Sequence, residues 1–101
     1  MIIEYIRYDL TTHQPEELMS AYAAAADALR AAPECQAFEL TRCEEAPQSF
    51  ILRIEWLSTG AHLQGFRQGP HFGSFLAAIK PFIPEIAEMR HYAPTSVVWT
   101  R

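Results

Sequence analysis

Residues 49–81 read SFILRIEWLSTGAHLQGFRQGPHFGSFLAAIKP, and the fold can be worked out from this stretch. Its first eight residues alternate, with Phe50, Leu52, Ile54 and Trp56 on one side. A period of two is typical of a strand that buries one face. The stretch therefore predicts a strand that delivers Trp56 to its end.

Two short helices are expected directly after this strand. Ser58 or Thr59 can cap the first helix, which carries Phe66 and gives way at a Gly-Pro pair. The second spans about residues 70–79 and is closed by Pro81. Most of the chemically suggestive side chains of the chain lie on these two helices and on the strand before them.

The segment before this strand completes a hairpin. Residues 35–44 alternate in the same way, with Phe38 and Leu40 on the apolar face. Only the polar break 44–48 separates them from the strand that begins at Ser49, so the two strands are expected to pair antiparallel.

The ends of the chain add further elements. Residues 2–10 carry β-branched and aromatic side chains on both faces and predict either a central strand covered on two sides or a sheet whose second face meets another subunit. A helix is expected over 15–31, because Pro15 suits a first helical position and apolar residues recur at intervals of three and four. Residues 85–92 favour a strand, although the pattern also fits a helix, and 96–99 predict a short terminal strand or arm.

The order of these elements predicts one domain over residues 1–101, an α+β ferredoxin-like βαββαβ sandwich with an antiparallel sheet. Its helices suffice to cover only one face of the sheet. The residues expected on or near the other face are too apolar to leave in water, so two chains should pack sheet against sheet as a homodimer. These residues are Ile3, Tyr5, Ala37, Ile51 and Met89.

The amino-acid composition and net charge indicate which classes of binding partner are expected. Eight Lys and Arg stand against twelve Asp and Glu, for a formal charge of −4, and no basic run is present to follow phosphates. A nucleic-acid partner is therefore not expected. No apolar run approaches the roughly 20 residues that span a bilayer, and the N-terminus has no signal-peptide pattern. The chain is expected to be cytoplasmic, with no membrane partner.

Two cysteines, Cys35 and Cys43, fall in one predicted strand. Eight residues of strand place them about 26 Å apart at ~3.3 Å per residue, whereas a disulfide needs Cα atoms within about 7 Å. We expect two free, structural thiols, in keeping with a reducing compartment.

The residues after the central strand match a known pattern. W-x-S-x-x-A-H-x-x-x-F is filled by residues 56–66, P-H-F by 70–72 and M-R-H-Y by 89–92. This arrangement resembles the antibiotic biosynthesis monooxygenase family of dimeric α/β-barrel proteins, and the resemblance extends over most of the chain in element order.

The resemblance implies a homodimer with a pocket between sheet and helices in each subunit. Some members of the family oxidise anthrone- or quinol-type aromatics with molecular oxygen and neither metal nor flavin, others cleave haem, and many have no assigned activity. Haem-degrading members place a histidine four residues past the position of Phe72, where this chain has Leu76, and an asparagine on the first strand, whereas this chain contains no asparagine.

Histidine is the side chain whose ordinary pKa best suits a base near neutral pH. His62 is the expected base, since it lies one helical turn before Phe66 and points to the same side. Trp56 and Tyr92 are expected to donate hydrogen bonds to a substrate oxygen. Residues expected to contact the substrate are Phe66, Arg67, His71, Phe72 and Phe75.

Each of these residues also has a structural interpretation. His62 can be an interface histidine, Trp56 can fill the core and Arg67 can form a surface ion pair. The four histidines, at 13, 62, 71 and 91, lack the spacing of a metal motif, so no metal is expected. The resemblance to members that work without metal or flavin implies that no cofactor is needed.

The leading hypothesis is a cofactor-independent monooxygenase, an oxidoreductase, acting on a small aromatic compound. Two alternatives stay open. One is a dimeric small-molecule-binding domain of the same fold without turnover, and the other is a haem-binding or haem-degrading protein.

Overall fold

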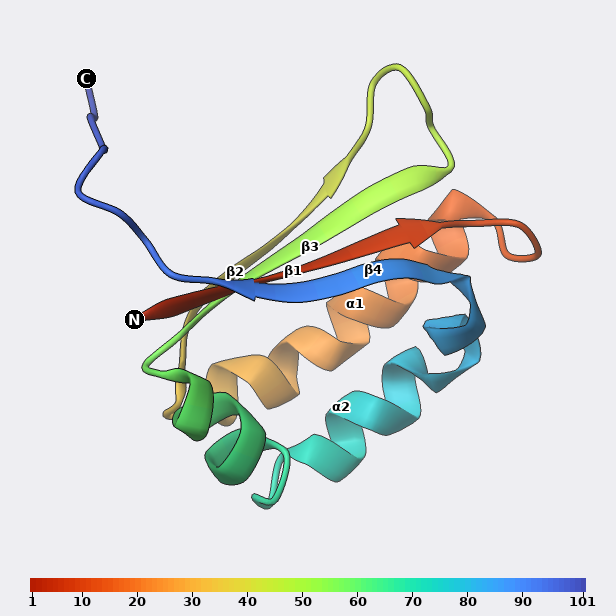
Figure 1. The fold of residues 1–101 in the computed structure, drawn as a ribbon. Coiled ribbons are helices and arrows are strands. Elements are labelled where there is room, and N and C mark those ends of the chain that lie inside the picture. The colour runs from red at the N-terminus through yellow and green to blue at the C-terminus, as the bar shows by residue number, and fades with distance from the viewer.

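The computed structural model describes all residues, 1–101, and has one four-stranded sheet in the order β2-β3-β1-β4 (Figure 1). All neighbouring strands are antiparallel. The elements are β1 (Ile2–Asp9), α1 (Pro15–Ala31), β2 (Cys35–Arg42), β3 (Ser49–Trp56), the π-helix η1 (Ala61–Phe66), α2 (Phe72–Ile79), the 3₁₀-helix η2 (Lys80–Glu85) and β4 (Ile86–Tyr92). The predicted α+β ferredoxin-like fold is confirmed, and the sheet of the single chain is open rather than closed into a barrel.

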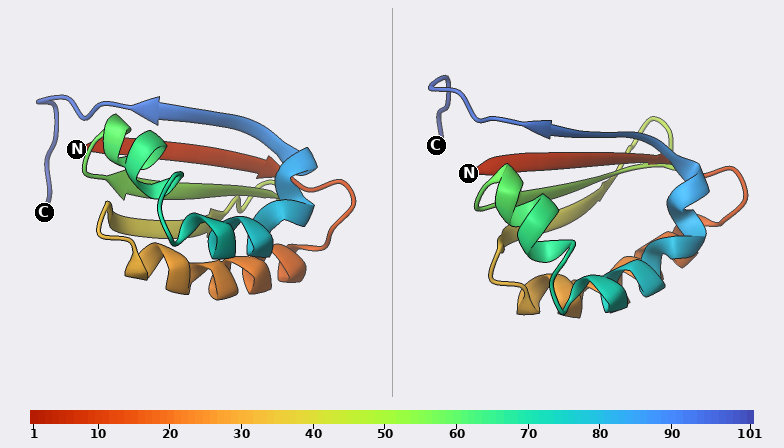
Figure 2. Two further views of the ribbon diagram at one scale, coloured as in Figure 1. Left: turned by 90° about the horizontal axis from the view of Figure 1, so that it is seen from below. Right: turned by 60° about the horizontal axis from the view of Figure 1, so that its bottom comes forward.

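Helices α1 and α2 lie side by side on one face of the sheet, as both views in Figure 2 show. Helix α1 begins at Pro15, as predicted, and has Glu16 and Glu17 in its first turn, where the helix dipole favours negative charge. Its stripe of buried residues packs on the sheet and includes Leu18, Tyr22, Ala25 and Leu29. The small alanines in this stripe let the helix approach the strands closely.

The inner face of the sheet supplies the other half of the core. The alternating residues of β3, namely Phe50, Leu52, Ile54 and Trp56, are all 0–1% exposed. Strand β2 pairs with β3 so that Phe38 lies opposite Ile54 and Leu40 opposite Leu52. The predicted hairpin and the predicted inner face are thus confirmed.

Strand β4 contains one irregularity that decides where its side chains point. Tyr8 lies opposite Ile86, but Arg7 lies opposite Glu88, so Ala87 is an extra residue in β4. The bulge brings Met89 opposite Ile6, on the inner face. Our expectation that Met89 belongs to the outer face was wrong, because simple alternation along residues 85–92 ignores the bulge.

No element of the chain covers the outer face of the sheet (Figures 1 and 2). Ile51 is 38% exposed there, and the ring of Tyr5 meets the ring of Tyr92 edge to face at 5.4 Å. The prediction that the helices cover only one face is therefore confirmed.

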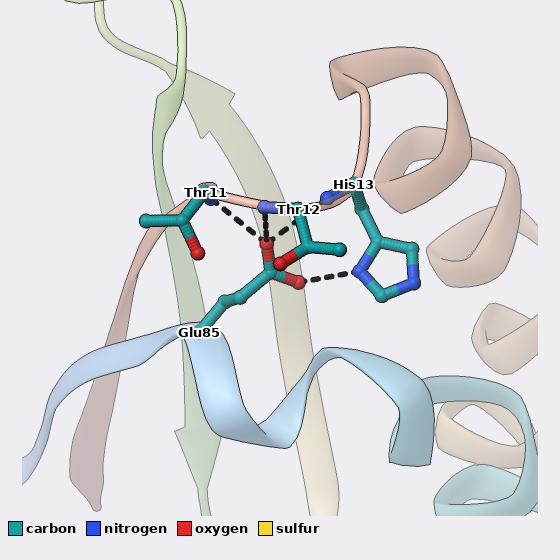
Figure 3. Close-up of polar contacts among 4 residues, drawn as sticks. All are labelled: Thr11, Thr12, His13 and Glu85. Carbon is teal, nitrogen blue, oxygen red and sulfur yellow. Dashed lines mark hydrogen bonds and ion pairs between the residues drawn. The ribbon is translucent and has the colours of Figure 1, made fainter.

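The connection from β1 to α1 is tied to η2 by a buried carboxylate (Figure 3). Glu85 Oε1 accepts backbone N–H groups of Thr11, Thr12 and His13 at 2.8, 2.8 and 3.1 Å, and Oε2 accepts from His13 Nδ1. These hydrogen bonds hold η2 against the end of the sheet, and η2 carries residues that line the site described below.

Beyond β4 the chain continues as an arm that runs away from the sheet (Figure 1). Val97, Val98 and Trp99 are 73–90% exposed, so the predicted terminal segment is an arm rather than a strand. Both cysteines are free, as expected. No helix has the length and apolar character needed to cross a membrane.

Candidate functional site

A cavity of about 470 Å³ lies between the inner face of the sheet and the helices. Thirteen of its sixteen lining residues are hydrophobic. Its volume and apolar lining are typical of small-molecule sites in proteins. The lining residues come from β1, α1, β3, η1, α2, η2 and β4, so almost every element of the fold contributes.

Three phenylalanines build one wall of the cavity. The ring of Phe66 meets those of Phe72 and Phe75 edge to face, at 5.7 and 5.5 Å between ring centres. Edge-to-face pairs favour a flat aromatic neighbour, because the ring edges are positive and the ring faces negative. This wall of the cavity is therefore aromatic and apolar.

The π-helix η1 places the second set of aromatic groups. Ser58 Oγ accepts the backbone N–H of Ala61 at 2.9 Å and so starts the helical segment, as predicted. The N–H of Arg67 reaches back five residues to the carbonyl of His62 at 3.0 Å. As a result His62 and Phe66 both turn inward and are buried.

The polar end of the cavity is built around Glu4. This carboxyl is only 2% exposed, and its Oε1 accepts the indole N–H of Trp56 at 3.0 Å. His62 Nε2 lies 3.5 Å from the same oxygen. The imidazole ring of His62 stacks on the indole of Trp56 with 4.4 Å between centres and 10° between planes.

A second histidine continues this arrangement. His62 Nδ1 and His91 Nε2 form a hydrogen bond of 2.7 Å. His91 is half-buried on β4 and lies directly opposite Glu4 in the sheet. Glu4, His62 and His91 therefore form a chain of contacts from the cavity to the edge strand.

Burial sets the protonation of this group. It raises the pKa of Glu4, against the opposing effects of the Trp56 hydrogen bond and of the basic groups of His91 and Arg67. The pKa of His62 is lowered to about 4, first by burial and then by Arg67 and His91. His62 is consequently neutral at pH 7.

The other polar point of the cavity is a pair of tyrosine hydroxyls. Tyr8 and Tyr22 share a hydrogen bond, and both residues line the cavity. Burial raises the pKa of Tyr8 to about 12 and raises that of Tyr22 further, so both hydroxyls keep their protons at neutral pH. Tyr8 is four residues beyond Glu4 on β1, about 13 Å away at ~3.3 Å per residue.

The structure brings together six of the eight residues predicted for the site. Trp56, His62, Phe66, Arg67, Phe72 and Phe75 all line the cavity. Two predicted residues lie elsewhere. Tyr92 is 45% exposed and packs on Tyr5 at the outer face, and His71 is half-buried outside the cavity lining.

Glu4 is the residue that sequence reasoning missed, although a signal was present. It follows Ile2 and precedes Ile6 and Tyr8 on the same side of β1. A carboxyl in the buried phase of a strand is rare unless it has partners. This chain has no asparagine on its first strand, but Glu4 places a polar group on that strand within the cavity.

Glu4, His62 and His91 are also the types of residue that bind metal ions. Ligand atoms of Glu4, His62 and His91 lie within 4.8 Å of one another. Two imidazole nitrogens bound at about 2.1 Å to one tetrahedral metal lie about 3.4 Å apart. The 2.7 Å between the rings of His62 and His91 is shorter than this, so the geometry is that of a hydrogen-bonded chain rather than of a ligand set.

Haem ligation by the route expected of haem-degrading relatives has no ligand in this cavity. Leu76 lines the cavity at the position where such relatives would carry the histidine. A hydrocarbon side chain cannot bind iron. The imidazole that lines the cavity is His62, and its two nitrogens face His91 and Glu4.

Comparisons with known proteins agree with this architecture. The structure is similar to that of a candidate antibiotic biosynthesis monooxygenase from Bordetella bronchiseptica, with 24% sequence identity, 93% of this chain and 96% of that chain covered, and a TM-score of 0.75. It is also similar to a point variant of SnoaB, a cofactor-independent oxygenase from Streptomyces nogalater, with 16% identity, 96% and 95% coverage and a TM-score of 0.79. No curated protein matches the sequence.

The sequence itself gives the family. The model of the family described as antibiotic biosynthesis monooxygenase matches residues 1–78, which is more than half of the chain. The chain therefore belongs to the antibiotic biosynthesis monooxygenase family.

Proposed function

We propose that this protein is a cofactor-independent monooxygenase that oxidises a small, planar aromatic compound of the quinol or anthrone type with molecular oxygen. The observation that supports this most is the apolar cavity with polar groups at two separated points, Glu4 with its partners at one and the Tyr8–Tyr22 pair at the other. A flat hydrocarbon with oxygen on opposite sides complements this pattern. The description of SnoaB as a cofactor-independent oxygenase points the same way.

The reaction requires little beyond a base and a dry cavity. Removal of one proton makes the substrate an electron-rich anion, which reduces oxygen and combines with it to form a peroxide on carbon. The O–O bond then breaks, so that an anthrone CH₂ becomes a carbonyl and the other oxygen atom leaves as water. Phe66, Phe72 and Phe75 exclude bulk water from the cavity. A group at the polar end of the cavity accepts the proton that the substrate loses.

We also propose that the working form is a homodimer. The outer face of the sheet carries exposed aromatic and aliphatic groups and a shallow hollow lined by Tyr5, Arg7, Ile51, Glu88 and Tyr92. Packing this face against its copy removes these groups from water. In this assembly Tyr92 contributes to the subunit interface instead of to catalysis.

The direct test is oxygen uptake with a panel of anthrones and hydroquinones, measured with and without a chelator. We expect uptake above the uncatalysed rate, one water formed per carbonyl, and no effect of the chelator. Ligand binding without uptake by any member of the panel would instead favour a binding domain. A Soret shift on titration with hemin would favour the haem alternative.

A pair of variants on α2 ties the activity to the cavity. Leu76 lines the cavity, whereas the neighbouring Ala77 faces solvent. Leu76→Trp should fill the cavity and abolish uptake, while Ala77→Trp adds the same side chain outside and should leave uptake within about twofold. Equal activity of the two variants would place the reaction elsewhere.

A further inference from the structure

We propose that Glu4 is the general base of this reaction, and that His62 and His91 are positioning residues that hold its carboxylate. This inference rests on the proposed function and replaces His62 as the group that takes the proton.

The two oxygens of Glu4 have different surroundings. Oε1 accepts from Trp56 and contacts His62. Oε2 forms no hydrogen bond, yet no buried side-chain oxygen or nitrogen of the chain lacks a partner. Oε2 therefore has access to open space, and the space that Glu4 lines is the cavity. One lone-pair-bearing oxygen is free to meet a ligand.

His62 is arranged in the opposite way. One ring nitrogen is hydrogen-bonded to His91 and the other faces Glu4, while the ring face is covered by Trp56. Its Nε2 forms no hydrogen bond but lies 3.5 Å from Glu4 Oε1, so this nitrogen faces the carboxylate. The imidazole therefore contacts the carboxylate oxygen that Trp56 also binds, while the other carboxylate oxygen is the one left open to the cavity.

The protonation of the groups agrees with this division of roles. A base near neutrality needs a pKa close to the working pH. Burial moves the pKa of Glu4 upward, toward this range, and moves that of His62 down to about 4, away from it. The groups that titrate or carry charge around Glu4 are Tyr8 on β1, Tyr22 on α1, His62 on η1, Arg67 after η1 and His91 on β4.

The carboxylate suffices to complete the reaction. Glu4 takes one proton from the CH₂ of an anthrone and returns it to the peroxide anion that forms when the substrate reduces oxygen. It then takes the second C–H proton while the O–O bond breaks heterolytically, and returns that proton to the departing hydroxide. The substrate carbon loses four electrons, oxygen gains four, and the products are a carbonyl and water.

The first test is a set of matched variants in the oxygen-uptake assay. Glu4→Gln keeps the shape of the side chain and should lower kcat at least 100-fold with little change in KM. Glu17→Gln, on the exposed side of α1, should leave kcat within twofold. In Glu4→Ala, added formate should restore part of the lost rate, which a purely structural role of Glu4 would not allow.

The pH profile separates the base from its positioning residue. The kcat/KM of the wild type should rise with pH through a pKa above 4.5, and this rise should disappear in Glu4→Gln. His62→Gln should retain more than a tenth of the activity and keep the rise, because Glu4 still supplies the carboxylate. His91→Gln should move the rise to higher pH, since the carboxylate loses a neighbour that favours its charge. A greater loss of kcat in His62→Gln than in Glu4→Gln would overturn the assignment.

A second measurement follows removal of the substrate proton without the reaction with oxygen. In D₂O without oxygen, the enzyme should accelerate exchange of the anthrone CH₂ protons, followed by NMR, and Glu4→Gln should not. Exchange by the wild type without oxygen uptake would contradict the monooxygenase and keep Glu4 as base. If Glu4→Gln retains both oxygen uptake and proton exchange, the protein is a monooxygenase but Glu4 is not its base. If the wild type shows neither activity, the proposed function and the proposed role of Glu4 are both wrong.

Discussion

The hydroxyl pair of Tyr8 and Tyr22 joins β1 to α1 inside the core. Tyr22→Phe removes one hydroxyl and leaves the other without its partner, which should lower the free energy of unfolding by about 1–3 kcal/mol. The double change with Tyr8→Phe should cost less than the sum of the single changes, because neither polar group is then left alone. Urea unfolding of the four proteins measures the coupling, and strictly additive losses would mean that the hydroxyls do not interact.

Glu85 shows how a single ionised side chain can fix a loop. Burial opposes its charge, but the hydrogen bonds of Thr12, His13 and Thr11 outweigh burial and lower the pKa of Glu85 to about 2. A carboxyl with a lowered pKa stabilises the fold fully above its ordinary value of 4.5, and this contribution is lost as the pH falls through about 2.

Glu85→Gln should therefore reduce the free energy of unfolding by about 1.5–3 kcal/mol at pH 7, because hydrogen bonds to a charged group are lost. The difference between variant and wild type should shrink between pH 4.5 and pH 2, as measured by urea unfolding across this range. A difference that stays constant with pH would show that the charge of Glu85 is not what holds the loop.

The roles of single residues were harder to predict from the sequence than the helices and strands. His62 and Trp56 stand out because their side chains are rare and their spacing is local. The role of Glu4 depends on partners 52 and 58 positions further along the chain, which no local pattern contains. Tyr92 looked equivalent to His91 in the sequence, yet one residue along a strand is enough to place it on the other face of the sheet.

At the scale of elements, two glycines close to the junction of η1 and α2 differ in the space around them. A Cβ on Gly69 would lie 2.5 Å from the carbonyl oxygen of Gly65, whereas a Cβ on Gly73 would meet nothing within 4 Å. Gly69→Ala should therefore force the turn to shift and cost about 1–3 kcal/mol. Gly73→Ala, within α2, should stabilise by about 0.5–1 kcal/mol.

Thermal unfolding measures both glycine variants, and the melting temperature should fall in Gly69→Ala and rise in Gly73→Ala. Because the turn holds Phe66 against the cavity, Gly69→Ala should also weaken ligand binding, while Gly73→Ala should not. Stabilisation by both changes would mean that the turn relaxes freely.

Elements with regular patterns were predictable almost to the residue. The helix over 15–31 and the strand over 49–56 begin and end where the sequence indicated, because proline, capping and alternation act locally. The 3₁₀-helix η2 and the bulge at Ala87 were not foreseen. Both arise where β4 must reach the edge of the sheet beside β1, and this is a tertiary requirement.

At the scale of the whole molecule, the outer face of the sheet leads to a test of assembly. Ile51 lies in the middle of this face and is partly exposed in the single chain. Ile51→Asp should convert a micromolar dimer into a monomer, because it would bury two carboxylates at the interface. Ala24→Asp, on the exposed side of α1, is the matched control and should leave the dimer intact.

Sedimentation velocity distinguishes these outcomes. A wild-type protein that sediments as a monomer at micromolar concentration would contradict the homodimer. The sequence could predict the open face, since the helices number too few to cover two faces, but the identity of the covering partner is a property of two molecules and leaves no periodic signal in one.

The extra residue at Ala87 gives this strand a property that an ordinary strand lacks. Removing Ala87 would restore uninterrupted pairing, with Ile86 still opposite Tyr8 and Glu88 still opposite Arg7, so every side chain after it would keep its side of the sheet. His91 would stay opposite Glu4, and Tyr92 would stay opposite Ile3. A one-codon deletion in the gene would thus leave the imidazole beside the cavity, so this strand carries one residue that natural variation can remove without altering the site.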